Sequence, residues 1–372
     1  MFSIFDSQMM LRAIELAKRG IYTTAPNPNV GCVITQGDDI VGEGFHFRAG
    51  ELHAEVHALR AAGDNAKGAT AYVTLEPCSH YGRTPPCADA LIAAGVSRVV
   101  CAMVDPNPKV AGRGIQRMRD AGIQVDVGLM QAQAEALNPG FIKVMKTGLP
   151  FVQLKLASSL DGRTALANGQ SKWITGDEAR ADVQVFRAQA GAILSTSQTV
   201  LDDNPSLNVR WEQLPDAVKA QYAQDNLRQP VRVILDTQRK VKDDAHLFSL
   251  DGEVIIVTAS QADSDNDTVK LLTVAKEAGQ LDLNSSLRAL ASYGINHIWV
   301  EAGATLAGSL LKAGLVDELI IYQAPKLMGS DSRALVNLHG MTCMTQVPAF
   351  ELTDVTRIGN DVRLRMQKPQ PE

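Results

Sequence analysis

Three potential metal ligands and one carboxylic acid stand at spacings that point to hydrolytic chemistry. His53 and Glu55 lie two residues apart at the start of a predicted helix. Cys78 follows Pro77 just after a predicted strand, and Cys87 ends the loop that Cys78 begins. One imidazole and two thiolates give zinc three protein ligands and leave its fourth position open, which is the arrangement of a catalytic site. We therefore expect a catalytic zinc ion here.

The chemistry of such a site is the hydrolysis of an amino group on an electron-poor ring. Zinc lowers the pKa of its water toward neutrality, so that hydroxide can attack a ring carbon. Glu55 is placed to take the water proton and to pass it to the ring nitrogen and then to the leaving amine. The pairing H-x-E with P-C-x-x-C is typical of zinc nucleobase deaminases. In this chain eight residues, 79–86, separate the two cysteines, where nucleic-acid editing deaminases have two.

A structural zinc site is the alternative interpretation. It would need a fourth protein ligand, for which His80, Cys32 or Cys101 could be proposed. Cys32 and Cys101 stand in apolar strand segments and are more simply explained as buried core thiols. An H-x-E triplet alone often arises by chance, but the two cysteines at helix and strand ends favour the catalytic site. His57 and His80 are then expected to be bystanders.

Composition restricts the partners of the chain. The 372 residues carry 36 Lys and Arg against 41 Asp and Glu, a net charge of -5, which offers no general attraction for DNA or RNA. No apolar run approaches the roughly 18 residues of a membrane span, and the first residues lack the pattern of a signal peptide. Five cysteines are an odd and sparse set for a disulfide framework. We expect a cytoplasmic protein that binds a small molecule and neither nucleic acid nor membrane.

The length favours two packed domains, both of the α/β class. The turn residues at 138–140 and 148–150 flank a short basic segment, so we place the boundary at 147/148. In the first domain, 1–147, we expect a helix capped by Asp6 and a largely parallel sheet covered on both faces. The other elements expected there are strands at 30–35, 40–44, 69–75 and 98–104 and helices at 54–62 and 88–94. In the second domain, 148–372, strands are expected at 151–157, 192–195, 231–235, 253–258, 297–301 and 318–324, with helices between most of them.

The motifs together resemble the bifunctional riboflavin-biosynthesis deaminase/reductases. In the first half the resemblance rests on segments 26–31, 53–55 and 77–87. In the second half it rests on 155–163, 171–175, 202–205 and 300–303. It therefore covers nearly the whole chain, in the family's order. A further match runs from Asp105 to Gly114, where it would help to fix the substrate.

The resemblance implies two successive reactions on one pathway intermediate. A cytidine-deaminase-like, three-layer amino-terminal domain would remove an amino group from the pyrimidinone ring of diaminohydroxyphosphoribosylaminopyrimidine. A dihydrofolate-reductase-like α/β domain would then use NADPH to reduce the ribosyl side chain to ribityl. The family also suggests a homo-oligomer, either a homodimer or a homotetramer. His53, Cys78 and Cys87 match the family's zinc ligands, and Glu55 matches its proton shuttle.

The resemblance also assigns residues in the second domain. The cofactor-contacting positions are Ala157, Trp173, Thr199, Asp203, Gly303, Ala304, Thr305, Leu306, Ala307, Gly308 and Ser309. The substrate-contacting positions are Ser171, Arg187, Leu207, Arg210 and Glu301. The guanidinium forks of Arg187 and Arg210 suit a sugar phosphate. The family often has Gly at the position of Ala302.

Residue chemistry alone leaves several points of the second domain open. There is no G-x-G-x-x-G after a strand, but a glycine-containing turn at 303–309 follows one and opens a helix, where backbone N–H groups could face phosphate. The same turn could instead be an ordinary connection between a strand and a helix. Opening of the sugar ring needs an acid, for which Asp203 is the candidate, although it could equally be a helix-cap or turn residue. A polynucleotide or nucleoside deaminase and a zinc-stabilised interaction module remain rival functions.

Overall fold

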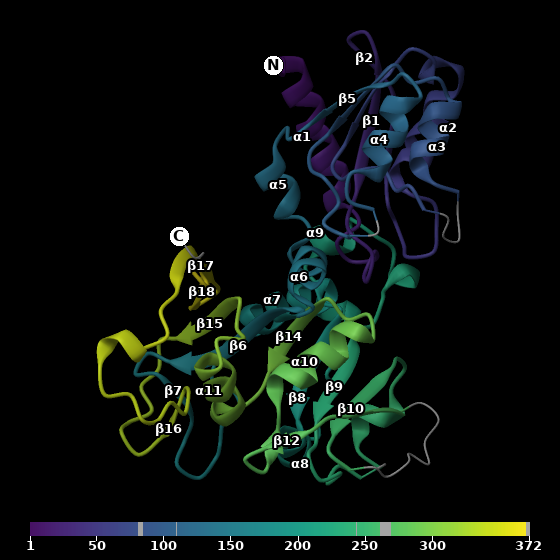
Figure 1. The fold of residues 1–372 in the computed structure, drawn as a ribbon. Coiled ribbons are helices and arrows are strands. Elements are labelled where there is room, and N and C mark those ends of the chain that lie inside the picture. Colours follow the sequence, from purple (N-terminus) through teal and green to yellow (C-terminus); the bar gives the residue numbers. More distant parts are fainter. Residues whose placement is uncertain (81–84, 109, 243, 261–268, 370–372) are drawn as a thin grey trace. The chain divides into compact units, whose positions relative to one another are not determined.

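The computed structural model divides into two compact units. It describes residues 1–80, 85–108, 110–242, 244–260 and 269–369. The units are Met1–Gly148 and Leu149–Glu372, so the division falls one residue after the position chosen from the turn residues. Figure 1 shows that each unit contains its own sheet with helices packed around it. Among the helices of the described residues, none is long and apolar enough to cross a membrane.

The first unit is built on one five-stranded sheet. Its elements are α1 (Ile4–Lys18), β1 (Gly31–Gln36), β2 (Asp39–Phe45), α2 (Ala54–Ala62), β3 (Thr70–Val73), α3 (Cys87–Ala93), β4 (Arg98–Cys101), α4 (Arg113–Asp120), β5 (Gln124–Val127), α5 (Gln131–Glu135) and α6 (Pro139–Thr147). The strand order is β2-β1-β3-β4-β5. Strand β1 is antiparallel to both β2 and β3, while β3, β4 and β5 are mutually parallel.

The expectation of a largely parallel sheet is therefore wrong for half of the strand pairs. Helix α2 carries the chain from β2 to β3, and these two strands lie on either side of β1. Because β2 forms a hairpin with β1, it must run against β1, and the crossover then returns β3 in the direction of β2. The sequence signals for the individual elements were sound, but they contained no information on which strand lies between the others.

Helices cover both faces of this sheet. A Cβ atom on Gly31 would lie 2.0 Å from the Ala13 carbonyl of α1, and one on Gly44 would lie 2.3 Å from the Ala54 carbonyl of α2. Gly31 is paired with Phe45, the neighbour of Gly44, so the two glycines point to opposite faces. Helix α1 thus packs on one face and α2 on the other, which gives three layers (Figure 1). Only glycine allows these helices to approach the strands so closely.

The first helix begins earlier than the sequence suggested. Ser3, not Asp6, is its N-cap: the Ser3 hydroxyl accepts from the Asp6 N–H at 2.9 Å, and the Asp6 carboxylate accepts from the Ser3 N–H at 2.8 Å. This reciprocal arrangement is a capping box, which places Asp6 in the first turn. Asp6 is also buried, and its carboxylate accepts from the Tyr72 hydroxyl at 2.9 Å and from Arg98 at 2.7 Å. The acid therefore joins α1 to β3 and β4.

We expect Asp6→Asn to destabilise the first unit by about 1–3 kcal/mol, because it removes one of the two carboxylates that pair with Arg98 and the charged acceptor of the Tyr72 hydroxyl. Urea unfolding followed by circular dichroism should show an earlier transition for this unit. Tryptophan fluorescence should not change, since Trp173, Trp211 and Trp299 all lie in the second unit. Asp38→Asn, at an exposed turn position, is the matched control and should leave both signals unchanged. An unaltered unfolding curve for Asp6→Asn would show that the pair contributes nothing.

The second unit is built on a nine-stranded sheet in the order β11-β10-β9-β8-β14-β6-β15-β18-β17. Its elements are β6 (Phe151–Ser159), β7 (Arg163–Ala165), α7 (Asp177–Gln189), β8 (Ala192–Thr196), α8 (Ser197–Asp203), α9 (Asp216–Lys219), β9 (Val231–Leu235), β10 (Val254–Thr258), β11 (Val269–Thr273), β12 (Lys276–Glu277), β13 (Gln280–Leu281), α10 (Leu283–Ser292), β14 (His297–Glu301), α11 (Ala304–Lys312), β15 (Glu318–Ala324), β16 (Arg333–Ala334), β17 (Glu351–Ile358) and β18 (Asp361–Gln367). The seven strands from β11 to β15 in this order are parallel, and β18 and β17 add antiparallel strands at one edge.

Both faces of this sheet are also covered. Helices α10 and α11 contribute to the apolar core on one face, and α7 contributes to the core on the other. Strand β14 lies between β6 and β8, although it follows both in the chain by about a hundred residues or more. In parallel sheets, ligands bind beyond the carboxyl ends of the strands, at the point where the strand order reverses. Here that point is where β6, β14 and β8 end.

Candidate functional site

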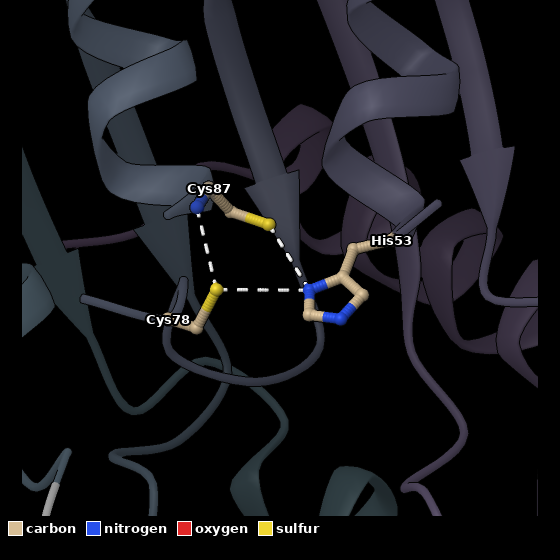
Figure 2. A group of neighbouring side chains, drawn as sticks. All are labelled: His53, Cys78 and Cys87. Carbon is tan, nitrogen blue, oxygen red and sulfur yellow. Dashed lines mark hydrogen bonds between the residues drawn. The ribbon is translucent and has the colours of Figure 1, made fainter. Parts of the chain in front are cut away.

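The predicted metal ligands come together at one end of the first unit's sheet. His53 is the residue before α2, Cys87 is the first residue of α3, and Cys78 lies in the segment that follows β3. The ligand atoms of the three side chains all lie within 4.8 Å of one another. His53 Nδ1 is 3.2 Å from the Cys87 sulfur and 3.6 Å from the Cys78 sulfur (Figure 2). The Cys87 N–H also donates to the Cys78 sulfur at 3.3 Å.

This donor set fits a tetrahedral metal site with one open position. One imidazole nitrogen and two sulfurs are the ligands that zinc prefers among protein side chains. The starts of α2 and α3 both face the cluster, and the partial positive charge of helix N-termini stabilises thiolates. Hydrogen bonds from Cys87 and His53 lower the pKa of Cys78, which favours the thiolate form that a metal ligand needs. Residues 81–84 of the loop between the cysteines lie outside the described residues.

Glu55 stands beside the cluster without belonging to it. It lies in the first turn of α2, is 3% exposed, and interacts with the Cys87 thiol. Burial, assisted by the charge of the Cys78 sulfur, raises the pKa of Glu55 to about 7. A carboxyl group with a pKa near neutrality can both accept and release a proton under physiological conditions. This is the property that a proton shuttle requires.

The other candidate ligands lie elsewhere. Cys32 and Cys101 are fully buried in the core of the first unit, as predicted for structural thiols, and burial raises the pKa of each. His80 is exposed and His57 is half-buried on α2. All five cysteines are free. Within the described residues, the metal-binding group therefore consists of three protein ligands.

A second histidine at this site was missed by the sequence analysis. The His46 ring packs edge-on against the His53 ring, with 5.2 Å between their centroids. His46 Nδ1 is 3.1 Å from the Leu52 carbonyl and its Nε2 is 3.0 Å from the Asn27 amide nitrogen. A neutral ring that donates through Nδ1 and accepts through Nε2 satisfies both contacts, and burial lowers the pKa of His46 in agreement with that form. The available signal was Asn27, in the Pro-Asn-Pro-Asn segment.

The second unit contains a cavity of about 2140 Å³ at the carboxyl ends of β6, β8 and β14. A drug-sized ligand occupies roughly 300–1,000 Å³, so the cavity has room for a dinucleotide and a second small molecule. The start of α11 lines it at Gly303, which holds an extended conformation before the helix. Backbone N–H groups at a helix start are a common contact for phosphate.

An ion pair forms part of the cavity wall. Arg187 donates to both carboxylate oxygens of Glu301, at 2.6 and 2.8 Å, and Trp299 donates to the same carboxylate at 2.8 Å. Burial alone would raise the pKa of Glu301, but the charge of Arg187 and these hydrogen bonds outweigh it and lower the pKa to about 2. The guanidinium fork that the sequence analysis assigned to a phosphate is therefore engaged by Glu301. Arg210, also in the wall, is exposed and donates to Gln213 at 3.3 Å.

Two family models match the chain, one in each unit. The model described as the cytidine and deoxycytidylate deaminase zinc-binding region matches residues 3–103. The model described as the RibD C-terminal domain matches residues 150–364. The chain belongs to the bifunctional riboflavin-biosynthesis deaminase/reductase family. It is a deaminase and a reductase of riboflavin biosynthesis, and the predicted order of a cytidine-deaminase-like domain and an α/β reductase domain is confirmed.

Similar proteins match this deaminase/reductase along their whole length. The riboflavin biosynthesis protein RibD of Escherichia coli is 56% identical over 363 residues, which cover 97% of this chain and 99% of that protein. The solved structure of Acinetobacter baumannii RibD is 47% identical, with a TM-score of 0.90, and covers 98% of this chain and 99% of its own. A Thermotoga maritima diaminohydroxyphosphoribosylaminopyrimidine deaminase/5-amino-6-(5-phosphoribosylamino)uracil reductase is 32% identical, with a TM-score of 0.84 over 98% and 99% of the two chains.

The reductase cavity gathers most of the positions that the resemblance assigned to it. The lining includes Ala157, Ser171, Trp173, Arg187, Thr199, Asp203, Leu207, Arg210, Glu301, Gly303, Ala304, Thr305, Leu306 and Ser309. Ala307 and Gly308 are not among the lining residues: Ala307 is fully buried in the core, and a Cβ on Gly308 would lie 2.0 Å from the Asn337 carbonyl. Their assignment to the cofactor stays a prediction.

Several polar contacts along this wall could not be predicted from the sequence. Asp203 ends α8, and Lys172 forms an ion pair with it at 3.0 Å. The Arg180 guanidinium carbon lies 4.3 Å from the centre of the exposed Trp173 ring. Lys155 of β6, which is paired in register with Glu301, also lines the cavity, and burial lowers its pKa. A lysine between two leucines of an apolar strand was the signal for this last residue.

Proposed function

We propose that the first unit hydrolyses an amino group from the pyrimidinone ring of diaminohydroxyphosphoribosylaminopyrimidine, with His53, Cys78 and Cys87 holding zinc and Glu55 moving the proton. The observation that carries this proposal is the convergence of three ligand atoms within 4.8 Å, beside a buried carboxyl group with a pKa of about 7. The Thermotoga maritima relative is named for deamination of this compound, which supports the assignment of the substrate. Bound zinc supplies the Lewis acidity that makes water nucleophilic near neutral pH.

In this reaction Glu55 takes a proton from the attacking water and delivers it to the ring nitrogen. A second transfer carries the remaining water proton to the exocyclic amine as the bond between carbon and nitrogen breaks. One water is consumed, one ammonia is released, and the ring carbon ends as a carbonyl. The buried position of Glu55 excludes bulk water from the transfer, and the His46 ring, held by Asn27, packs against the His53 ring and would fix its orientation.

For the second unit we propose reduction of the deaminated product, with its ribosyl group becoming ribityl. Bound NADPH supplies the hydride. The start of α11 and Thr199 would hold the cofactor together with Ala157, Trp173 and Asp203. Ser171, Leu207 and Arg210 would hold the substrate, and the Arg187–Glu301 pair would fix the wall between them. The size of the cavity supports this proposal, because its volume of about 2140 Å³ exceeds the roughly 300–1,000 Å³ of a pocket for one drug-sized ligand.

The reduction also needs a proton. Opening of the sugar ring gives an imine whose C1′ carbon accepts the hydride, while its nitrogen gains a proton to become the amine. Asp203 remains our candidate for the acid that assists ring opening. If it has that role, Asp203→Asn should lose reduction even at saturating NADPH, where weaker cofactor binding no longer limits the rate of NADPH oxidation. Full reduction by the variant would assign Asp203 to the helix-end and Lys172 contacts alone.

Metal removal should separate the two reactions. We expect chelation of the full-length protein to stop ammonia release and to leave NADPH oxidation by the deaminated sugar phosphate unchanged, because the ligand group lies wholly in the first unit. Restoring zinc should restore ammonia release. The measurement is a paired assay of ammonia and of absorbance at the NADPH band before chelation, after chelation and after zinc addition. Loss of both activities together would contradict two separate sites.

We also propose that the chain works in the cytoplasm as a homodimer or a homotetramer. The five free cysteines support a reducing compartment. Strand β17 ends the nine-stranded sheet and exposes Leu352 and Val355, which supports pairing with another copy along this edge. Light scattering coupled to gel filtration tests the assembly: a monomer at micromolar concentration would contradict it.

A further inference from the structure

A buried carboxylate lies between the zinc-ligand segment and the loop that follows β4. Glu76 lies two residues before Cys78 and is 3% exposed. One of its oxygens accepts from the N–H of Asp105 at 3.1 Å and of Gly112 at 2.9 Å. The other accepts from Gly114 at 2.9 Å and from Ile115 at 3.3 Å. A single side chain thus organises both ends of a loop of about ten residues.

These four bonds saturate the carboxylate. An ionised carboxyl group offers four lone pairs and no donor, so it suits four backbone N–H groups. Gly114 and Ile115 are in the first turn of α4, whose N–H groups have no partner within the helix. The positive end of the helix adds to the attraction of the negative charge. Glu76 therefore caps α4 from a distant point in the chain and joins Asp105 to the start of that helix.

The loop and the ligand segment are also in direct contact. A Cβ atom on Gly114 would lie only 2.1 Å from the Pro77 carbonyl oxygen and 3.3 Å from a Glu76 carboxylate oxygen. The backbone that carries Cys78 therefore lies against the first turn of α4. Asp105, at the other end of the loop, is 7% exposed, and burial raises its pKa to about 6. Displacement of this loop would remove the packing of Gly114 against Pro77, the residue before Cys78.

We propose that Glu76 is a positioning residue for the deamination site, acting through the backbone of Pro77 and Cys78 and through the 105–115 loop. It touches neither the metal ligand atoms nor the proton shuttle. Its function is to fix the direction of the Cys78 sulfur relative to His53 and Cys87. This inference rests on the zinc site proposed above. Changes to groups that orient metal ligands typically reduce metal affinity or activity about 10–100-fold.

The test uses the full-length protein loaded with Co²⁺, whose visible spectrum reports the number and geometry of thiolate ligands. In Glu76→Gln, the amide nitrogen is a donor facing two N–H donors, so two of the four bonds become unfavourable. We expect the thiolate-to-cobalt bands to shift and zinc release to a chelator to accelerate about 10-fold or more. The rate of ammonia release should fall by a similar factor, mainly in kcat.

A second variant leaves the carboxylate in place. Gly114→Ala forces a methyl group against the Pro77 carbonyl and should displace the same segment. We expect it to reproduce the spectral shift and the faster zinc release. Asp6→Asn is the control for general destabilisation, because it weakens the same unit through Tyr72 and Arg98. Its cobalt spectrum should equal that of the unaltered protein.

The outcomes separate this inference from the proposed function. If the unaltered protein binds neither Co²⁺ nor Zn²⁺, the zinc site itself is wrong and the role of Glu76 falls with it. If the unaltered protein binds metal but both variants keep its spectrum and release rate, zinc binding stands and the positioning role is overturned. If Asp6→Asn gives the same spectral shift as Glu76→Gln, the effect is loss of stability rather than positioning, and the inference is likewise overturned. Reductase activity of each variant records whether the rest of the chain is folded.

Discussion

Glu55→Gln should abolish ammonia release while leaving zinc bound. The amide cannot accept the proton of the attacking water, and general acid–base catalysis by one positioned group accounts for about 10²–10⁴-fold in rate. Glu55 is not among the clustered ligand atoms, so its replacement removes no metal contact. We therefore expect a loss of at least about 100-fold in kcat for deamination, within that range. Ammonia release and zinc content, measured on the same preparation, check the prediction.

Glu51→Gln is the matched control for this change. Glu51 lies four residues earlier and is half-exposed in a surface contact with Arg48. It should keep full deamination. Reduction of the deaminated substrate should be unchanged in both variants, since neither residue lies in the second unit. A Glu55→Gln protein that lost its zinc would identify Glu55 as a ligand, and one that kept its rate would remove it from the mechanism.

Glu301→Gln should have the largest effect on the stability of the second unit. It leaves Arg187 charged, 10% exposed and without its counter-ion, and removal of one partner of a buried pair costs about 3–5 kcal/mol. Because folding lowers the pKa of Glu301 from 4.5 to about 2, its contribution is fully present above pH 4.5 and is lost as the pH falls toward 2. Urea unfolding followed by tryptophan fluorescence should show this difference at pH 7, and a smaller one at pH 3.

Two controls show whether the loss comes from the unpaired charge. Asp216→Asn breaks an exposed pair with Lys219 in the same unit and should change the unfolding curve little. The double variant Arg187→Met/Glu301→Leu removes both charges and should recover much of the stability lost by Glu301→Gln. It should not recover reduction, because the cavity wall would lose its polar groups. Equal losses for the single and double variants would show that packing, rather than charge, is responsible.

Much of the fold could be predicted from local pattern. The helix at 54–62 and the strands at 231–235, 297–301 and 318–324 have the bounds that the apolar periodicity indicated. The order of the strands in each sheet was harder to predict. It depends on which strands pack together in the folded core and not on local sequence. The position of β1 between two strands that run against it, and the two antiparallel strands β18 and β17 at one side of the second sheet, were not anticipated. The early start of α1 could not be predicted either. Asp6 is a residue type that often caps helices, but Ser3 is the N-cap.

The metal site was predictable because its chemistry requires rare residue types. One histidine and two cysteines, two of them at helix starts and one after a strand, seldom occur together by chance. The supporting residues are common types, so their roles depend on partners distant in sequence. Glu76 binds backbone groups 29 to 39 positions away, and Arg187 pairs with Glu301 across 114 positions. No local pattern indicates such contacts. Arg187 was assigned to the substrate on the resemblance, and that contact stays a prediction.

The late insertion of β14 has a consequence for biosynthesis on the ribosome. The strand fills the centre of the second sheet between β6 and β8, which emerge long before it. Strands β6 and β8, within residues 151–196, therefore cannot form their native pairing with β14 until translation has passed position 301. The first unit is continuous in sequence and can complete its core earlier, since domains fold as units during synthesis. We expect nascent chains stalled near residue 250 to contain a protease-resistant deaminase unit followed by an accessible, chaperone-dependent segment.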